Sequence, residues 1–172
     1  MKRTLNFLFV LFFLVTGFCG CTQKYGIIKS HAYVRETTAG NIPVDQNNIP
    51  TSAGVRTNHI IYVETDSSRR PIPQWETAWV DGVSYSIEPI AVKNAEVNLG
   101  QLKNEAKEAV VKAKEGNELW QLMLTKKNGL EANATLKEMI EKNKIVITGQ
   151  WKGNPFSYKI SEQQQLAKVF GE

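Results

Sequence analysis

The chain has 172 residues and a formal net charge of +4 at pH 7, from 21 lysines and arginines against 17 aspartates and glutamates. Lysines and glutamates are mixed along the chain rather than clustered with aromatic residues, which excludes a nucleic-acid-binding protein. Both cysteines, Cys19 and Cys21, lie near the N-terminus, so the rest of the chain can form neither a disulfide nor a zinc–thiolate site, and it holds no cysteine nucleophile.

The first 20 residues predict a secretory signal. Lys2 and Arg3 precede an apolar run over residues 5–15, which is shorter than the roughly 20 residues of a membrane-spanning helix. The next segment, Phe18-Cys19-Gly20-Cys21, resembles the signal of bacterial lipoproteins, in which a small residue precedes the cysteine that becomes acylated. The resemblance implies cleavage directly before Cys21, lipid attachment to that residue and anchoring at a bacterial membrane.

The remaining residues, 21–172, are predicted to form one domain. Removing residues 1–20 from the 172 leaves 152, which suffices to bury a core without disulfides or metals. Lys2 and Arg3 leave with the signal, so the net charge falls from +4 to +2. In some lipoproteins an aspartate after the modified cysteine retains the protein at the inner membrane. Because Thr22 follows Cys21, the resemblance implies the outer membrane, on its periplasmic face.

The first third of the domain predicts two strands and two loops. Residues 25–36 predict a strand, and residues 37–58, rich in glycine and proline, predict a long loop of the kind that is either functional or disordered. Residues 59–65 form a nearly continuous apolar run, typical of a central strand covered on both faces. The next loop, 66–74, contains Arg69-Arg70, which could hold a phosphate or carboxylate but in such a loop more often lies in solvent.

A hairpin is the best-specified element. Residues 75–80 and 83–89 flank Asp81-Gly82, and Asp-Gly between two β-rich runs is a strong hairpin signal because a type I′ turn needs two residues at positive φ. The turn fixes the register, so that Val80 faces Val83 on the side predicted to join the core.

The opposite face of this hairpin is the candidate binding surface. Trp79 lies opposite Ser84 and Trp75 opposite Glu88, so two tryptophans lie among hydroxyls and a carboxylate. We interpret the face either as an open surface that stacks on a flat ligand or as a face covered by a helix, and both alternatives remain open. Its residues are Trp75, Thr77, Trp79, Ser84, Ser86 and Glu88.

Residues 96–128 fit two alternatives. Apolar residues at helical spacing favour a helix in the first part, whereas Gly116-Asn117 favours a hairpin in which Val111 lies opposite Leu122 and one whole face is apolar. We favour the hairpin, and predict a strand over residues 119–125.

The next segments predict a helix and a hairpin. Thr135 and Glu138 have the spacing of a capping box, which predicts a short helix that ends near Asn143. Residues 145–151 and 156–160 predict two strands, paired so that Trp151 lies opposite Phe156 and one face is apolar or glycine.

A last helix is predicted from Ser161, where the capping spacing recurs, with Leu166, Val169 and Phe170 as its packing stripe. The predicted fold class is therefore α+β: a mainly antiparallel sheet built from hairpins, with one or two short helices in the C-terminal third.

The sequence predicts no catalytic site, metal or cofactor. His31 and His59 lie in or beside apolar strands and lack the spacing of metal ligands, and neither a nucleophile elbow, a Walker loop nor a dinucleotide fingerprint occurs. The acidic pair Glu64 and Asp66 is interpreted as solvated. We therefore do not predict an enzyme.

Two functions remain. The first is a non-enzymatic, membrane-anchored lipoprotein that binds an envelope protein, in its sharpest form an inhibitor or immunity-type protein whose loop 37–58 enters a partner's cleft. The second is a carbohydrate- or peptidoglycan-associated module, catalytic or not, that stacks sugars on Trp75 and Trp79. Exposure of the two indoles distinguishes the alternatives.

Overall fold

The computed structural model describes residues 24–38, 45–49, 54–94 and 96–170. The predicted signal, Cys21, and residues 39–44 and 50–53 of the predicted loop lie outside these residues. The elements are η1 (Lys24–Gly26), β1 (Ile27–Thr38), β2 (Val55–Asp66), β3 (Gln74–Val80), β4 (Val83–Ala91), β5 (Glu96–Gln101), β6 (Glu108–Lys112), β7 (Asn117–Lys126), α2 (Ala134–Lys142), β8 (Ile145–Trp151), β9 (Asn154–Ile160), β10 (Gln164–Gln165) and β11 (Val169–Phe170).

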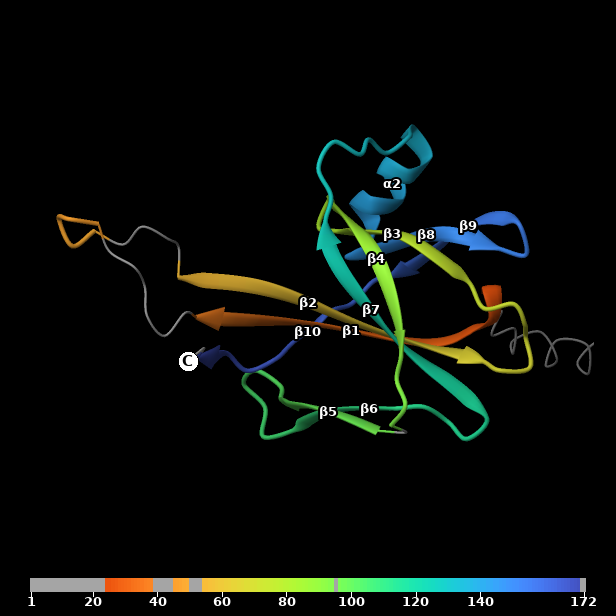
Figure 1. Ribbon diagram of the computed structural model, residues 1–172, viewed down its shortest axis with the longest axis horizontal. Coiled ribbons are helices and arrows are strands. Elements are labelled where there is room, and N and C mark those ends of the chain that lie inside the picture. Colours follow the sequence, from red (N-terminus) through yellow and green to blue (C-terminus); the bar gives the residue numbers. More distant parts are fainter. Residues whose placement is uncertain (1–23, 39–44, 50–53, 95, 171–172) are drawn as a thin grey trace, which may run out of the picture.

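The fold is nearly all-β, so the prediction of an α+β class is wrong. The structure is 60% strand and 8% helical, and α2 is the single α-helix of the described part. One curled sheet has the order β10-β1-β2-β7-β4-β3-β8-β9, with β11 also pairing with β1, and β5 and β6 form a separate two-stranded layer (Figure 1). Only β10 and β11 run parallel to their neighbour, and the other ladders are antiparallel.

The predicted C-terminal helix is replaced by the two short strands β10 and β11. The backbone N–H of Leu166 donates to the carbonyl of Val34 at 2.9 Å, and the N–H of Lys103 donates to Gln165 at 2.8 Å. Leu166 is buried between these partners. Backbone bonds to distant strands therefore override the local helical pattern of this segment.

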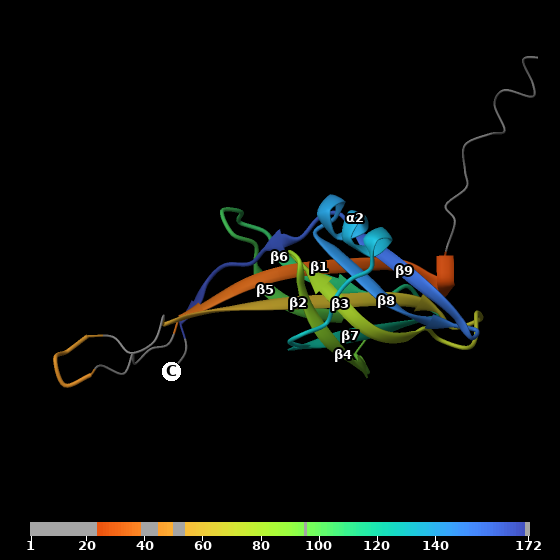
Figure 2. The same ribbon diagram turned by 90° about the horizontal axis from the view of Figure 1, so that it is seen from above.

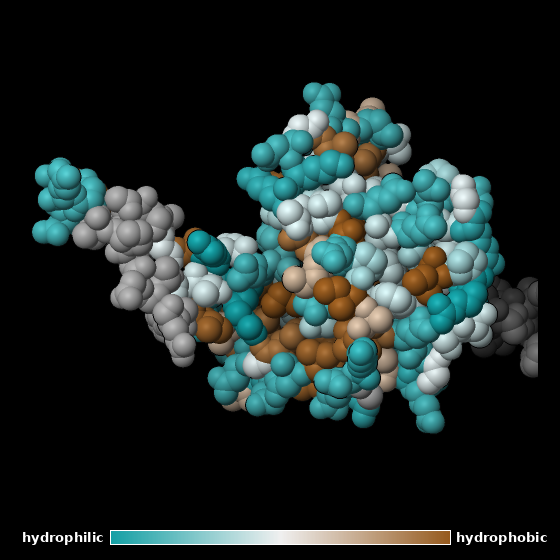
Figure 3. Space-filling view, viewed as in Figure 1, coloured by the Kyte–Doolittle hydropathy of each residue, from teal (hydrophilic) through white to brown (hydrophobic). Residues whose placement is uncertain are grey.

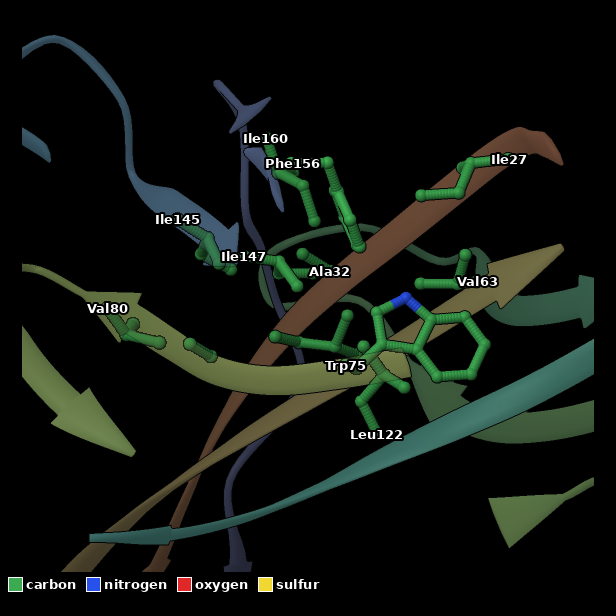
Figure 4. Close-up of a cluster of buried hydrophobic side chains, with 12 residues drawn as sticks. Ile27, Ala32, Val63, Trp75, Val80, Leu122, Ile145, Ile147, Phe156 and Ile160 are labelled. Carbon is green, nitrogen blue, oxygen red and sulfur yellow. The ribbon is translucent and has the colours of Figure 1, made fainter. Parts of the chain in front are cut away.

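The prediction of β2 as a central strand is confirmed. It lies between β1 and β7, and both Ile61 and Val63 are completely buried. The inner face of the curled sheet encloses one apolar cluster, in which Trp75, Ile147 and Phe156 meet side chains from β1 and β2 (Figure 4). A second cluster lies on the outer face, where the β5–β6 layer covers β1, β2 and β7.

The β3–β4 hairpin has the predicted register over four pairs, from Thr77 with Ser86 to Val80 with Val83. Beyond Thr77 the prediction fails, because the β3–β8 ladder shifts register between Trp75 and Thr77. This bulge turns Trp75 toward the inner face, and Glu88 pairs with Met123 of β7 instead.

Residues 96–128 contain the three strands β5, β6 and β7 and no helix, but the predicted hairpin across Gly116-Asn117 is wrong. Val111 of β6 lies opposite Val97 of β5, whereas β7 pairs with β2 and β4. The buried carboxylate of Glu64 in β2 accepts hydrogen bonds from the Lys114 backbone N–H at 2.9 Å and from the Asn117 side-chain amide. These bonds fasten the turn to the sheet, so that the chain passes from one layer into the other.

The C-terminal hairpin exists, with a register two residues from the predicted one. Trp151 lies opposite Asn154 and Gly149 opposite Phe156, because Lys152 and Gly153 both have positive φ and make a two-residue turn. A shift of two keeps every side chain on its predicted face.

The predicted middle helix is confirmed as α2. It begins two residues earlier than the predicted capping box requires, because Asn133 and not Thr135 caps it, its side chain accepting from the Leu136 N–H at 2.9 Å. It ends as predicted, with Asn143 as its C-cap.

A substitution at Gly149 tests how closely β3 and β8 approach each other at the bulge. A Cβ at this position would lie 2.0 Å from the carbonyl oxygen of Gln74, so β3 and β8 would have to separate. We expect Gly149→Ala to lower the free energy of unfolding by about 1–3 kcal/mol, measured by chemical denaturation. The exposed neighbour gives the control, since Gln150→Ala should stay within about 0.5 kcal/mol of the parent. Equal stability of both variants would contradict the close approach of the strands.

Candidate interaction surfaces

The predicted tryptophan surface is not formed. Trp75 is 5% exposed and packs in the inner core, with its ring centroid 5.6 Å from that of Trp120. Trp79 remains on the outer face but is 6% exposed, because α2 and the loop before it cover it, with Leu130 and Ile140 lining the small hollow beside its ring. Of the two alternatives for this face, the helix cover is correct for Trp79, and the bulge removes Trp75 from the face.

The other predicted residues divide between the covered and the open part of the outer face. Thr77 and Ser84 are buried near Trp79, whereas Ser86 is half-buried and Glu88 exposed. Beyond them Ile90 and Met123 are 46% and 44% exposed. Apolar surface is visible between the α2 end and the β5–β6 layer (Figure 3). This open part is a mixed surface with two apolar side chains.

The adjacent arginines are engaged in ion pairs. The Arg69 Nε lies 3.4 Å from the Asp66 carboxylate, and Arg70 pairs with Glu118. Hydrogen bonds from Ser68 hold the pKa of Asp66 below its usual value. A pocket of about 570 Å³ opens beside Arg70, but its rim carries lysines and glutamates together, so its charge selects no class of ligand.

His31, His59 and Glu64 make contacts that serve the fold. Burial lowers the pKa of both His31 and His59, and the Nδ1 of His59 lies 3.2 Å from the Gln163 amide. Glu64 is 5% exposed rather than solvated as predicted, because it anchors the turn between β6 and β7. Within the described residues no group of three or more His, Cys, Asp and Glu side chains could hold a metal ion.

A strand edge that the sequence did not reveal is the strongest candidate. β2 pairs with β7 only from Ile61 to Asp66, whereas its pairing with β1 continues to Val55. Residues 55–60 therefore have one edge without a strand partner in the described part of the chain, and we call them the free edge. The first four, Val55 to Asn58, are exposed. Their polar composition predicts a loop, and the pairing with β1 makes them a strand instead.

The free edge has few of the features that usually protect an exposed strand. Residues 55–60 contain neither proline nor lysine, and Arg56 is their only formally charged residue. The register between β1 and β2 is also continuous there, since the bulge of this ladder lies at Ile27 and Lys29. Such an edge can accept another extended strand.

The free edge projects from one end of the molecule, and the described chain begins at the other. β1 leads from η1 to this projecting end, and at a rise of about 3.3 Å per residue its first and last of 12 residues lie roughly 36 Å apart. Both views show the paired ends of β1 and β2 extending beyond the rest of the sheet (Figures 1 and 2).

No protein family, curated protein or solved structure matches this chain. In the part that the structure describes, no helix is long and apolar enough to cross a membrane. Function is therefore inferred from geometry and from the N-terminal sequence.

Trp79 distinguishes a covered from an open outer face. Since the indole is buried beneath α2, Trp79→Ser should lower the free energy of unfolding by about 3–5 kcal/mol. Met123→Ser, on the open part of the same face, should change it by about 0.5 kcal/mol or less. Thermal melting of both variants measures the difference, and a small effect at Trp79 would mean that α2 leaves this face open.

Proposed function

We propose that this protein is a lipid-anchored, non-enzymatic binding protein of the bacterial envelope, which presents its free edge to an extended segment of a partner protein. The single observation that carries the proposal is the unpaired edge of residues 55–60, at the end of the molecule remote from the start of β1. An inhibitor or immunity-type role is one form of this function, because residues 39–54 connect the two strands of the projecting hairpin.

Strand addition explains how such a surface binds. A peptide laid along β2 would make backbone hydrogen bonds to the free edge, which supply affinity. Side chains alternate between the two faces of the strand, so Val55 and Thr57 would contact the peptide on one face and Arg56 on the other. These three side chains would supply specificity.

The lipid anchor supplies location. The N-terminal sequence supports acylation of Cys21, four residues before Tyr25, and Thr22 supports an outer-membrane position facing the periplasm. Confinement to a membrane raises the effective concentration of any envelope partner, so a short edge can suffice for binding.

The carbohydrate-binding alternative is not proposed. It required Trp75 and Trp79 to form one exposed stacking surface, and both indoles are buried on opposite faces of the sheet.

Anchoring is tested at the two cysteines. Cys21→Ser should leave the protein unprocessed or soluble, because the thiol that carries the lipid is removed, whereas Cys19→Ser should not alter membrane association. Fractionation with detergent phase partitioning, and the mass of the N-terminal peptide, measure both effects. Loss of membrane association in Cys19→Ser alone would overturn the assignment of Cys21.

The free edge is tested by photocrosslinking in living cells. A benzoylphenylalanine replaces exposed Thr57 on the free edge or, as the matched control, exposed Lys159 on β9. We expect an adduct of discrete mass with an envelope protein at Thr57 and none at Lys159, identified by mass spectrometry. Adducts at the control position only, or at neither position, would refute binding through the free edge.

A further inference from the structure

Three segments form the end of the molecule at which the described chain begins. The rings of Tyr25 and Trp151 meet edge-on with centroids 6.2 Å apart, and the Trp151 Nε1 donates to the carbonyl of Pro71 at 2.9 Å. Gly26 lies against the same loop, since a Cβ there would be 3.5 Å from Arg69. We call residues 25–26, 69–71 and 151–153 the end face. The turns that carry them gather at one end in both views (Figures 1 and 2).

The end face presents positive charge outward. The Arg69 side chain is 46% exposed against 22% for its partner Asp66, and Arg70 is 57% exposed against 32% for Glu118. In each pair the cation is therefore the more accessible group. Exposed Lys152 adds a third cation, with its Nζ 4.5 Å from the centroid of the Trp151 ring.

The N-terminal sequence limits how far this face can move from an anchor. Only Thr22, Gln23 and Lys24 separate Cys21 from Tyr25. A fully extended chain spans at most about 3.6 Å per residue, so the Tyr25 backbone lies within about 14 Å of Cys21. The Debye length at physiological ionic strength is about 8 Å, so a tether of this reach lets the face come within the distance over which surface charges attract one another.

We propose that the end face docks on the anionic headgroups of the membrane in which Cys21 is anchored. This inference rests on the proposed lipidation. Accessible cations beside a tryptophan and a tyrosine suit the boundary between lipid and water. Docking at this end directs β1 away from the membrane. The free edge then lies at the end remote from the lipid, where a partner protein can reach it.

The test measures how close each end of the anchored protein lies to the lipid. Because Cys21 is the only cysteine of the processed chain, a thiol introduced by Asn154→Cys or by Thr57→Cys can carry a fluorophore alone. Both positions are exposed, the first beside the end face and the second on the free edge. The full-length gene is expressed, and the processed protein is purified from membranes, labelled and reconstituted in phosphatidylethanolamine–phosphatidylglycerol vesicles containing a headgroup nitroxide quencher.

We expect stronger quenching at position 154 than at position 57. The difference should persist when ten glycine and serine residues are inserted after Gln23, because docking and not tether length holds the face. It should fall with Lys152→Glu and at high salt, whereas Lys168→Glu, a charge reversal at another exposed lysine, should leave it unchanged.

The outcomes separate the two proposals. If the parent protein does not float with the vesicles, the lipidation fails and the docking with it. If it floats but both labels are quenched equally, or if the long tether abolishes the difference, docking alone is overturned. A difference that is insensitive to salt and to Lys152→Glu would overturn recognition of anionic headgroups.

Discussion

The backbone ladder between β1 and β2 connects every part of the molecule to which a role can be given. It pairs residues from Ile27 with Thr65, beside the end face, to Thr38 with Val55, on the projecting hairpin. The half of this ladder that lies in the body of the molecule is buried between the two apolar clusters, and this packing fixes the direction of both strands. The outer half extends from that fixed base with no change of register, so the orientation of the free edge follows from the packing of the core.

Local signals of the sequence predicted much of this framework. Asp81-Gly82 gave the register of its hairpin because a two-residue turn leaves few alternatives, and the apolar run around Ile61 identified the central strand. Where the prediction failed, the cause was a distant contact. Trp75 changes face because β3 bulges where its backbone meets Gly149 of β8, a contact that no alternation within β3 reveals.

The candidate site was harder to predict than the fold. The free edge depends on where β7 separates from β2, at Ile61, beyond which β7 pairs with β4 alone. At the other end of the same ladder, the buried Glu64 fastens the turn before β7. A carboxylate inside an apolar run is a signal for buried hydrogen bonding, since an unpaired buried charge is costly. Interpreted in that way, Glu64 predicts a fixed turn nearby, although it does not name Lys114 and Asn117 as the donors.

The terminal strand β9 and the free edge of β2 differ in composition. β9, at one end, pairs only with β8 and carries Pro155 and Lys159, residues that discourage further strand pairing. From Val55 to Ile60, β2 has neither proline nor lysine, Arg56 is its one formally charged residue, and residues 55–58 are exposed. This contrast supports the proposal that an extended segment of a partner pairs with the free edge. In the proposed arrangement, docking of the end face on the membrane points the free edge away from the lipid.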